Sequence, residues 1–317
     1  MFHTLVSFAK PQPDTIAAAF LLRRFGEGRF PGISTAKAEY WTELPPGKTT
    51  ESLEEQGVLL IDLGNGRFDH HRTRQDDQLV KCASELVAEE LNLNGDTALK
   101  KLLAYVRRDD LEGKGTLSVD PLDRAFGLSG LLTNLNKAYA HDLDGVTRIV
   151  LAMFEAHYQE EENRTKIMPL EWRRLLEAGE AAQWSLQHSE GILRVAQLQS
   201  DNSGFPGFLR AYHHFDIVAI RRTTGHVNII TGQAKRLDLA PVIAWIRGMT
   251  MKHRGVDAIS SQRLHAPGQI SEVPEWYYDT AANTLQNGGI RPNGVEPTSL
   301  RDEQIAQALR NGLTKKD

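Results

Sequence analysis

Acidic and histidine side chains recur in the first part of the chain at positions that could bind a metal ion. The candidates are Asp14, Asp62, Asp69, His70, His71, Asp109 and Asp110. Carboxylate oxygens and imidazole nitrogens suit Mn²⁺, Fe²⁺ or Zn²⁺. Separated acidic points together with a histidine pair are what a two-metal hydrolytic site requires, because carboxylates offset the charge of the cations and imidazole completes their shell.

The segments around these residues predict how a fold would bring them together. The apolar run 59–63 is typical of a buried strand of a parallel sheet, and Asp62 lies at its carboxyl end. Ligands of open α/β sheets gather at that edge. A first strand over 4–8 is followed by a helix over 15–25, which Asp14 can cap. We therefore expect Asp14 and Asp62 to meet at one edge of the sheet.

The order strand, helix, strand, strand at the start of the chain predicts an α/β fold with a mainly parallel sheet. We expect a metal-binding domain over 1–145, a helical linker over 146–190 and a smaller α+β substrate-binding domain over 191–317. The glycine-rich segment 203–208 is typical of a loop. Further strands are predicted at 36–41, 192–198, 217–221 and 227–231, and further helices at 82–91, 97–107, 123–136, 239–251 and 300–313, the last capped by Thr298 or Ser299.

Composition and charge limit the class of protein. The 317 residues are 40% hydrophobic and 25% charged, which is typical of a soluble globular protein of two domains. The net charge of -4 provides no global field that attracts nucleic acid or membranes. Cys82 is the only cysteine, so no intrachain disulfide can form, and we expect a cytoplasmic location. We expect no secretory signal, and no apolar run approaches the roughly 18 residues of a membrane span. An oligomer is possible.

Three stretches resemble motifs of the DHH phosphoesterase superfamily, which includes RecJ-type exonucleases, nanoRNases, cyclic-dinucleotide phosphodiesterases and pyrophosphatases. The run from Asp62 through Asp69-His70-His71 is similar to its second motif, and the helix 82–91 to its third. The Arg-Phe-Asp-His-His run is also similar to that of the Myg-type exonuclease branch. Residues 11–18 resemble the first motif, in which a Pro-Asp-x-Asp-Ala-Ile run opens the first helix. The resemblance covers roughly residues 1–135.

The resemblance implies a role for each matched residue. Asp14, Asp62, Asp69 and one of Asp109 and Asp110 would bind Mn²⁺, as one or two ions, with Mg²⁺ possible. His70 would contact metal or phosphate, and His71 would position the scissile phosphate. The chain departs from the family at two positions, because the first-motif histidine falls on Phe8 and the first aspartate on Gln12. Either the enzyme uses one metal, or His3 or another residue replaces the missing ligand, or hydrolysis is lost.

Basic residues elsewhere could contact the substrate. Guanidinium groups hold phosphate oxygens with two parallel hydrogen bonds, and histidines can serve the same purpose. The candidates are Arg72, Arg107, Arg108, His213 and His214.

The expected function is that of a Mn²⁺-dependent phosphoesterase, a nuclease-like hydrolase. It would cleave phosphodiester bonds of nucleotides or short nucleic acid with a metal-activated water. Two alternatives stay open. One is a degenerate relative that binds a nucleotide or a partner without hydrolysis, and the other is a pyrophosphatase-like hydrolase.

Overall fold

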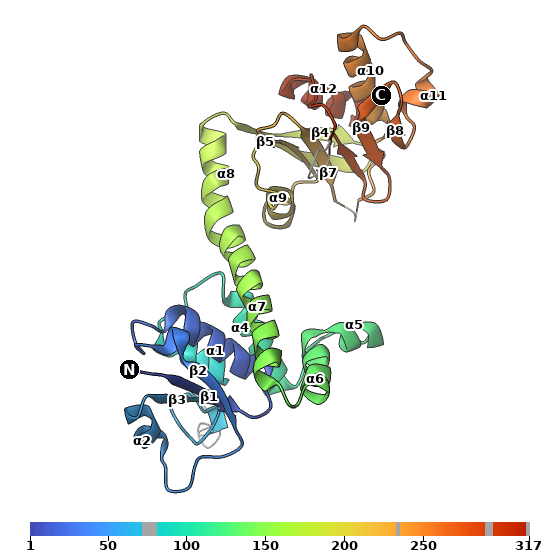
Figure 1. Ribbon diagram of the computed structural model, residues 1–317. Coiled ribbons are helices and arrows are strands. Elements are labelled where there is room, and N and C mark those ends of the chain that lie inside the picture. Colours follow the sequence, from blue (N-terminus) through green and yellow to red (C-terminus); the bar gives the residue numbers. More distant parts are fainter. Residues whose placement is uncertain (72–80, 233–234, 289–293, 315–317) are drawn as a thin grey trace. The chain divides into compact units, whose positions relative to one another are not determined.

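The computed structural model of the protein describes residues 1–71, 81–232, 235–288 and 294–314. The chain divides into two compact units, Met1–Lys166 and Ile167–Asp317, which Figure 1 shows in colours that follow the sequence. Each unit has its own sheet and its own apolar core. The fold is mixed α/β, as the sequence predicted.

The first unit is built on a three-stranded sheet in the order β2-β1-β3. All of its pairings are parallel, and β1 is central. A short 3₁₀ turn, Ile33–Thr35, precedes β2. The strands and helices of this unit are β1 (Thr4–Phe8), α1 (Pro13–Phe25), β2 (Lys37–Trp41), α2 (Thr50–Glu55), β3 (Val58–Ile61), α3 (Ala83–Glu90), α4 (Lys100–Glu112), α5 (Pro121–Phe126), α6 (Leu128–Ala138) and α7 (Leu143–Glu162).

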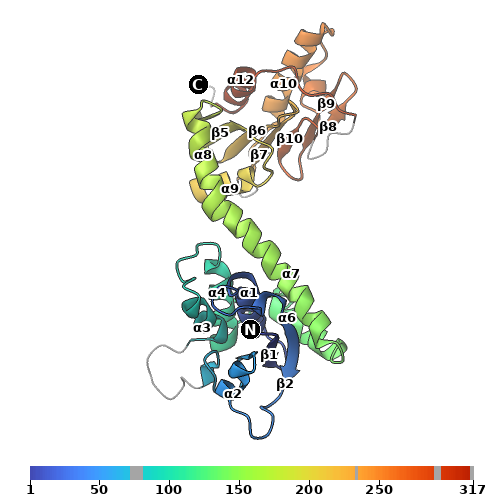
Figure 2. The ribbon, with the colours of Figure 1, turned by 60° about the vertical axis from the view of Figure 1, so that its left-hand side comes forward.

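Successive residues of β1 enter two different apolar clusters, because side chains alternate across a strand. Leu5 packs with α1, α3, α4 and α7 on one face of the sheet. Val6 packs with Leu53 of α2 on the other face. Figure 2 shows α1 and α2 on opposite sides of the strands. The three consecutive alanines Ala17–Ala19 are buried, and their small side chains let α1 lie close to its neighbours.

The prediction of a helical linker over 146–190 is wrong beyond residue 177, where the helix ends. α7 continues through a π-helical turn (Asn163–Ile167) into α8 (Met168–Glu177). Gly179 then adopts a left-handed conformation with φ of 73°, which ends the helix. The next segment is β4 (Ala181–His188). The boundary between the two compact units accordingly falls within a helical stretch, after residue 166.

The second unit contains a mixed seven-stranded sheet in the order β4-β5-β6-β7-β10-β9-β8. Arg301, and not Thr298 or Ser299, occupies the position that precedes the last helix. After β4 the elements are β5 (Gly191–Gln199), α9 (Phe205–His213), β6 (Ile217–Arg221), β7 (Val227–Thr231), α10 (Ala240–Arg254), α11 (Ser261–Leu264), β8 (Gly268–Ile270), β9 (Val273–Asp279), β10 (Thr284–Gln286) and α12 (Asp302–Leu313).

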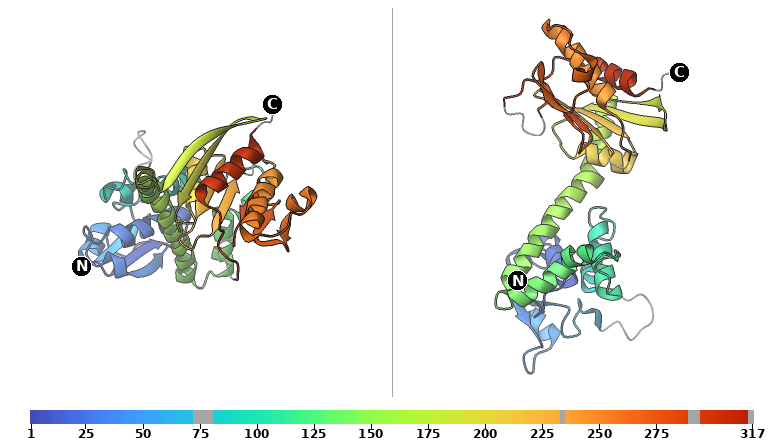
Figure 3. Two further views of the ribbon diagram at one scale, coloured as in Figure 1. Left: turned by 90° about the horizontal axis from the view of Figure 1, so that it is seen from above. Right: turned by 90° about the vertical axis from the view of Figure 1, so that its right-hand side faces the viewer.

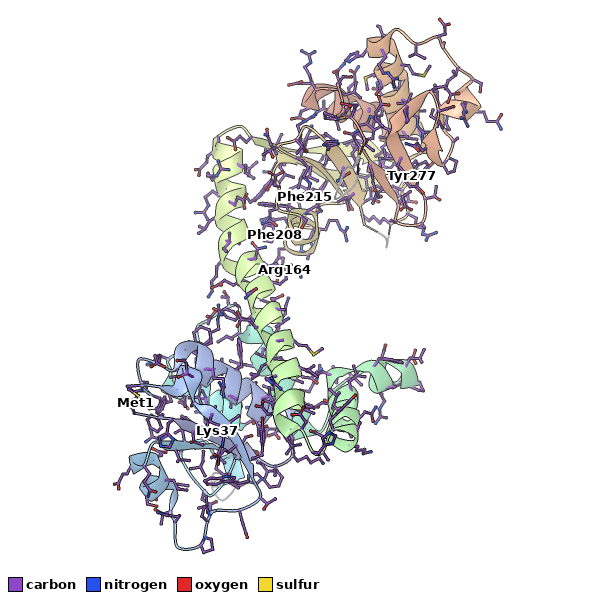
Figure 4. The ribbon with its side chains drawn as sticks, viewed as in Figure 1. Met1, Lys37, Arg164, Phe208, Phe215 and Tyr277 are labelled. Carbon is purple, nitrogen blue, oxygen red and sulfur yellow. The ribbon has the colours of Figure 1, made fainter. Side chains whose placement is uncertain are left out.

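Helices cover this sheet on both faces. α10 and α12 pack on one face. α8 and α9 pack on the other, where Phe208 and Phe215 belong to one buried cluster; both are labelled in Figure 4. Within the described parts of the chain, no helix is long and apolar enough to cross a membrane.

Asp96 joins the start of the α4 region to the end of α7. Its carboxylate lies 3.0 Å from Lys166 Nζ and accepts hydrogen bonds from the Tyr158 hydroxyl and from the amide of Ala98. Desolvation alone raises the pKa of Asp96, but these hydrogen bonds and the charge of Lys166 hold it below its ordinary value. The ionised carboxylate therefore stabilises the folded state.

Replacing Asp96 by asparagine should lower the free energy of unfolding at neutral pH by about 1–2 kcal/mol, because an ionised acceptor of several hydrogen bonds is lost. The pKa of Asp96 is lowered on folding, so its contribution is complete above about pH 4 and is lost as the pH falls below that value. Urea denaturation of both proteins between neutral pH and about pH 3 should show the difference shrinking. A difference that grows on acidification would contradict this assignment.

Candidate metal centre

The segment that follows β3 forms a tight loop that carries Asp62, Asp69, His70 and His71. Asp62 comes directly after the strand with φ of 53°, a left-handed conformation that is uncommon for a residue with a Cβ atom. Its amide donates a hydrogen bond of 3.0 Å to the carbonyl of Phe68. The loop therefore returns to the strand end, and the two histidines that follow lie beside Asp62.

Asp69 holds this loop together. Its Oδ2 accepts a hydrogen bond of 2.7 Å from the amide of Asn65, and its Oδ1 accepts one of 2.9 Å from the amide of His71. Oδ1 also lies 3.0 Å from Nδ1 of the His71 ring. Asp69 is buried and adjacent to the possible ligands. It belongs to neither group of converging ligand atoms described below.

His70 lies at the centre of the candidate site. Its Nδ1 is 2.9 Å from Oδ1 of Asp62, and its Nε2 is 3.7 Å from Oδ2 of Asp110. Among the described residues, two groups of three possible ligands have their ligand atoms within 4.8 Å of each other inside the group, and both groups include this ring. The first group is Asp62, His70 and His71. The second is Asp14, His70 and Asp110.

The surroundings of His70 are strongly acidic. The hydrogen bond with Asp62 raises the pKa of His70, burial lowers it, and the charges of Asp62, Asp110 and Asp14 raise it further, so that the pKa lies above its ordinary value. Three carboxylates around one imidazole leave negative charge in a site shielded from water. A cation bound there would offset that charge.

His71 differs from His70 in exposure. Its ring stacks on that of His70 with centroids 4.2 Å apart, yet 53% of its side chain is exposed. Its Nδ1 lies 3.4 Å from Oδ1 of Asp62. His71 can therefore reach both the acidic group and solvent.

Asp14 enters the site from the first turn of α1. It lies two positions inside the helix, where Gln12 is the preceding cap residue, so the prediction that Asp14 itself caps α1 is wrong. Instead, its carboxylate accepts hydrogen bonds at the start of α3, from the amides of Ala83 (2.8 Å) and Ser84 (3.0 Å) and from the Ser84 hydroxyl. Burial raises the pKa of Asp14, and these hydrogen bonds oppose the rise. Ser84 was not predicted from the sequence as a partner of Asp14. The only local sign of such a role is that Ser84 lies in the first turn of a helix.

Asp109 and Asp110, near the end of α4, have different partners. Asp110 directs its carboxylate toward Nε2 of His70 and belongs to the second ligand group. Asp109 instead accepts a short hydrogen bond from the hydroxyl of Ser129. Neighbouring residues of a helix point about 100° apart, so only one of the two faces the histidine.

The predicted substrate contacts are distributed over several places. Arg107 binds Glu85 at 2.7 Å, and Arg108 donates to the carbonyls of Lys114 and Gly115. Arg72 lies outside the described residues. His213 and His214 belong to the second unit, at the end of α9, where the ring of His213 packs against Trp172 and Phe208.

The two positions that depart from the DHH motifs serve packing and capping. Phe8 packs with apolar residues on the α2 face of the sheet. Gln12 precedes α1, and its amide donates to the hydroxyl of Thr15. His3 cannot replace a missing ligand, because it lies before β1, beside Gly57, at the opposite end of the strands from Asp62. A strand of this length separates the two edges by about 15 Å.

Comparison with known proteins adds little to this geometry. No family model matches the sequence, and no curated protein matches it. One similar solved structure is the crystal structure of an uncharacterized protein from Helicobacter pylori G27, with 12% sequence identity, 99% of each chain covered and a TM-score of 0.28. At this level the similarity supports no conclusion about the function of the chain.

Proposed function

We propose that the protein is a divalent-metal-dependent phosphoesterase of the DHH type that hydrolyses phosphodiester bonds of nucleotides or short nucleic acid, with Mn²⁺ as its cofactor. The observation that carries the proposal is the convergence of three carboxylates on one buried imidazole, with Asp62 at Nδ1 of His70, Asp110 at Nε2, and Asp14 in one group of neighbouring ligand atoms with His70 and Asp110. The order of these residues along the chain is that of the DHH motifs.

The residues fit a divalent cation by the chemistry of their donor atoms. Carboxylate oxygens and imidazole nitrogens suit Mn²⁺, and their burial raises the cost of leaving the negative charge without a counterion. Asp62 lies at Nδ1 of His70, and Nε2 is the nitrogen that faces Asp110. A carboxylate that orients the far nitrogen of a ligating histidine is a common arrangement at metal sites. The set that would hold the metal is therefore Asp14, His70 and Asp110.

The chain's own residues supply binding and orientation. Asp62 fixes the ring of His70, and Asp69 fixes the loop that presents His71. The half-exposed His71 can donate a hydrogen bond from a ring N–H to a phosphate oxygen and so orient the substrate beside the site. A divalent cation bound there would act as a Lewis acid on a phosphoryl oxygen and make water nucleophilic at neutral pH.

The basic residues contribute only if their present contacts leave donors for the substrate. A guanidinium group carries five N–H donors. Arg107 donates to Glu85, and Arg108 donates to two loop carbonyls. Phosphate binding by these two side chains stays part of the proposal, as does binding by Arg72, His213 and His214.

A second candidate function follows from Phe8. An apolar side chain stands where the family has a metal-binding histidine, and it is packed against its neighbours. This favours one metal over two. It also supports the alternative function, in which the protein binds a nucleotide or a partner without hydrolysing it. A pyrophosphatase-like activity is a third possibility that shares the same metal set.

Calorimetric titration with Mn²⁺ and hydrolysis assays test these functions in order. We expect binding at micromolar Mn²⁺, together with cleavage of bis-p-nitrophenyl phosphate and of a labelled oligonucleotide. Binding without cleavage of these or of pyrophosphate would favour the non-hydrolysing relative. Cleavage of pyrophosphate alone would favour the third possibility. No binding at micromolar Mn²⁺ would rule out the metal-dependent enzyme.

A further inference from the structure

The two edges of the seven-stranded sheet differ in their protection against pairing with another strand. β8 has three residues and a register irregularity between Gln269 and Ile270. β4 has eight residues, all paired in register with β5. Figure 3 shows the β4–β5 hairpin extending at the margin of the sheet. An edge strand presents a row of N–H and C=O groups, and proteins commonly blunt such edges by short length, bulges, charge or proline.

β4 has none of these protective features. Its sequence, Ala-Ala-Gln-Trp-Ser-Leu-Gln-His, contains no lysine, arginine, acidic residue or proline. In the first unit, by contrast, the edge strand β2 carries Lys37 and Glu39, and the Lys37 side chain is labelled in Figure 4. The other edge strand there, β3, has four residues. Among the described edge strands, β4 is thus the one that is long and carries no lysine, arginine or acidic side chain.

We propose that β4 pairs antiparallel with β4 of a second copy of this chain, so that the two seven-stranded sheets become one continuous sheet. When a strand without lysine, arginine or acidic residues pairs with its own copy, no like charges of the strand meet. A two-fold axis perpendicular to the sheet relates the two strands, so both copies contribute the same surface to the contact. The inference does not depend on the proposed phosphoesterase activity, because every residue that carries it belongs to the second unit.

The faces of the strand limit the register of this pairing. Trp184 and Leu186 face the cluster under α10 and α12. A two-fold axis perpendicular to the sheet keeps that face continuous, and directly opposite residues in an antiparallel pair share a face. The axis must therefore lie between one residue of β4 and the same residue of the second copy, so that this residue is opposite itself. Trp184 and Ser185 are the central choices.

Charge at the ends of β4 selects between them. An axis at Trp184 places Glu180 opposite His188 of the second copy at both ends of the contact. An axis at Ser185 moves Glu180 past His188 toward Glu190, in the turn that follows β4, and like charges that face each other across a strand pair are unfavourable. Nδ1 of His188 accepts a hydrogen bond of 3.2 Å from the amide of Glu190, so Nε2 carries the proton and can donate to a carboxylate. The carboxylate of Glu180 lies 3.2 Å from the exposed Arg174. We therefore assign the axis to Trp184.

Sedimentation equilibrium of the full chain at micromolar concentration tests the pairing. We expect a mass twice the 35.4 kDa of the chain. The Ser185→Lys variant places two lysines diagonally across the axis and should weaken dimerisation at least tenfold. The matched control, Gln269→Lys, adds the same charge to the opposite edge of the same sheet and should leave the dimer intact. A monomeric wild-type chain, or equal weakening by both variants, would overturn the proposal.

Disulfide cross-linking tests the register. With the axis at Trp184, residue 183 of one copy lies opposite residue 185 of the other. The double variant Gln183→Cys with Ser185→Cys should form a covalent dimer on mild oxidation, whereas each single variant should not. Wild type is the control for Cys82, which is buried. Cross-linking by Ser185→Cys alone would move the axis to Ser185 and contradict the assignment.

Discussion

Replacing Asp110 by asparagine should weaken Mn²⁺ binding about a hundredfold or more, whereas the same change at Asp109 should alter it by less than about threefold. The two residues are neighbours on α4, but only Asp110 directs its carboxylate to Nε2 of His70. Asp109 is engaged with the hydroxyl of Ser129 instead. Asparagine has nearly the same volume as aspartate, so the comparison isolates the loss of charge and of one acceptor oxygen.

Calorimetric titration of wild type and both variants with Mn²⁺ measures this difference, and hydrolysis of bis-p-nitrophenyl phosphate should follow the same order. Far-UV circular dichroism of the metal-free proteins serves as the control for folding. Equal losses of affinity in the two variants would mean that the whole end of α4 had shifted. A loss confined to Asp109→Asn would contradict the ligand set that we propose.

The regular elements were largely accessible from the sequence where a single local pattern decides the structure. β1, β6 and β7 have the predicted bounds, because short apolar runs between turn residues permit little else. α9 was missed, since Gly204, Pro206 and Gly207 are typical of a loop. Proline is tolerated in the first turn of a helix, and the buried residues Phe205, Phe208 and Leu209 follow helical spacing. The tertiary burial of that face outweighs the local loop signals.

The candidate site was predictable in its composition but not in its contacts. The positions of Asp14 and Asp62 relative to the first and third strands predicted that they meet at one edge of the sheet, and the structure places each of them in a group with His70. The hydrogen bonds of Asp14 to Ser84 join residues far apart in sequence, and no local pattern encodes them. The choice between Asp109 and Asp110 depends on the rotation of α4 about its axis. Packing of the whole helix fixes that rotation.

Replacing Asp14 by alanine should lower the free energy of unfolding of the first unit by about 3 kcal/mol in the absence of any metal. The carboxylate is the acceptor for three donors at the start of α3, the amides of Ala83 and Ser84 and the Ser84 hydroxyl. It is 1% exposed, so water cannot readily take its place. Donors left without an acceptor in such a site carry their full desolvation cost.

Urea denaturation followed by far-UV circular dichroism measures the loss, and hydrogen exchange should report faster exchange at the amides of Ala83 and Ser84. The Ser84→Ala variant removes one of the three donors and should cost about 1 kcal/mol. Asp110→Asn should leave the stability of the metal-free protein within about 1 kcal/mol of wild type, because it removes one charge from a crowded acidic group.

These variants separate two roles that Asp14 combines. If Asp14 served only the metal, its removal would leave the metal-free protein as stable as wild type, and only the stabilisation by Mn²⁺ would disappear. If it served only α3, Asp14→Ala would be less stable but would gain as much from Mn²⁺ as wild type does. We expect both losses together, because the same buried carboxylate caps α3 and lies within 4.8 Å of the ligand atoms of His70 and Asp110. A site built in this way couples metal binding to the stability of the first unit.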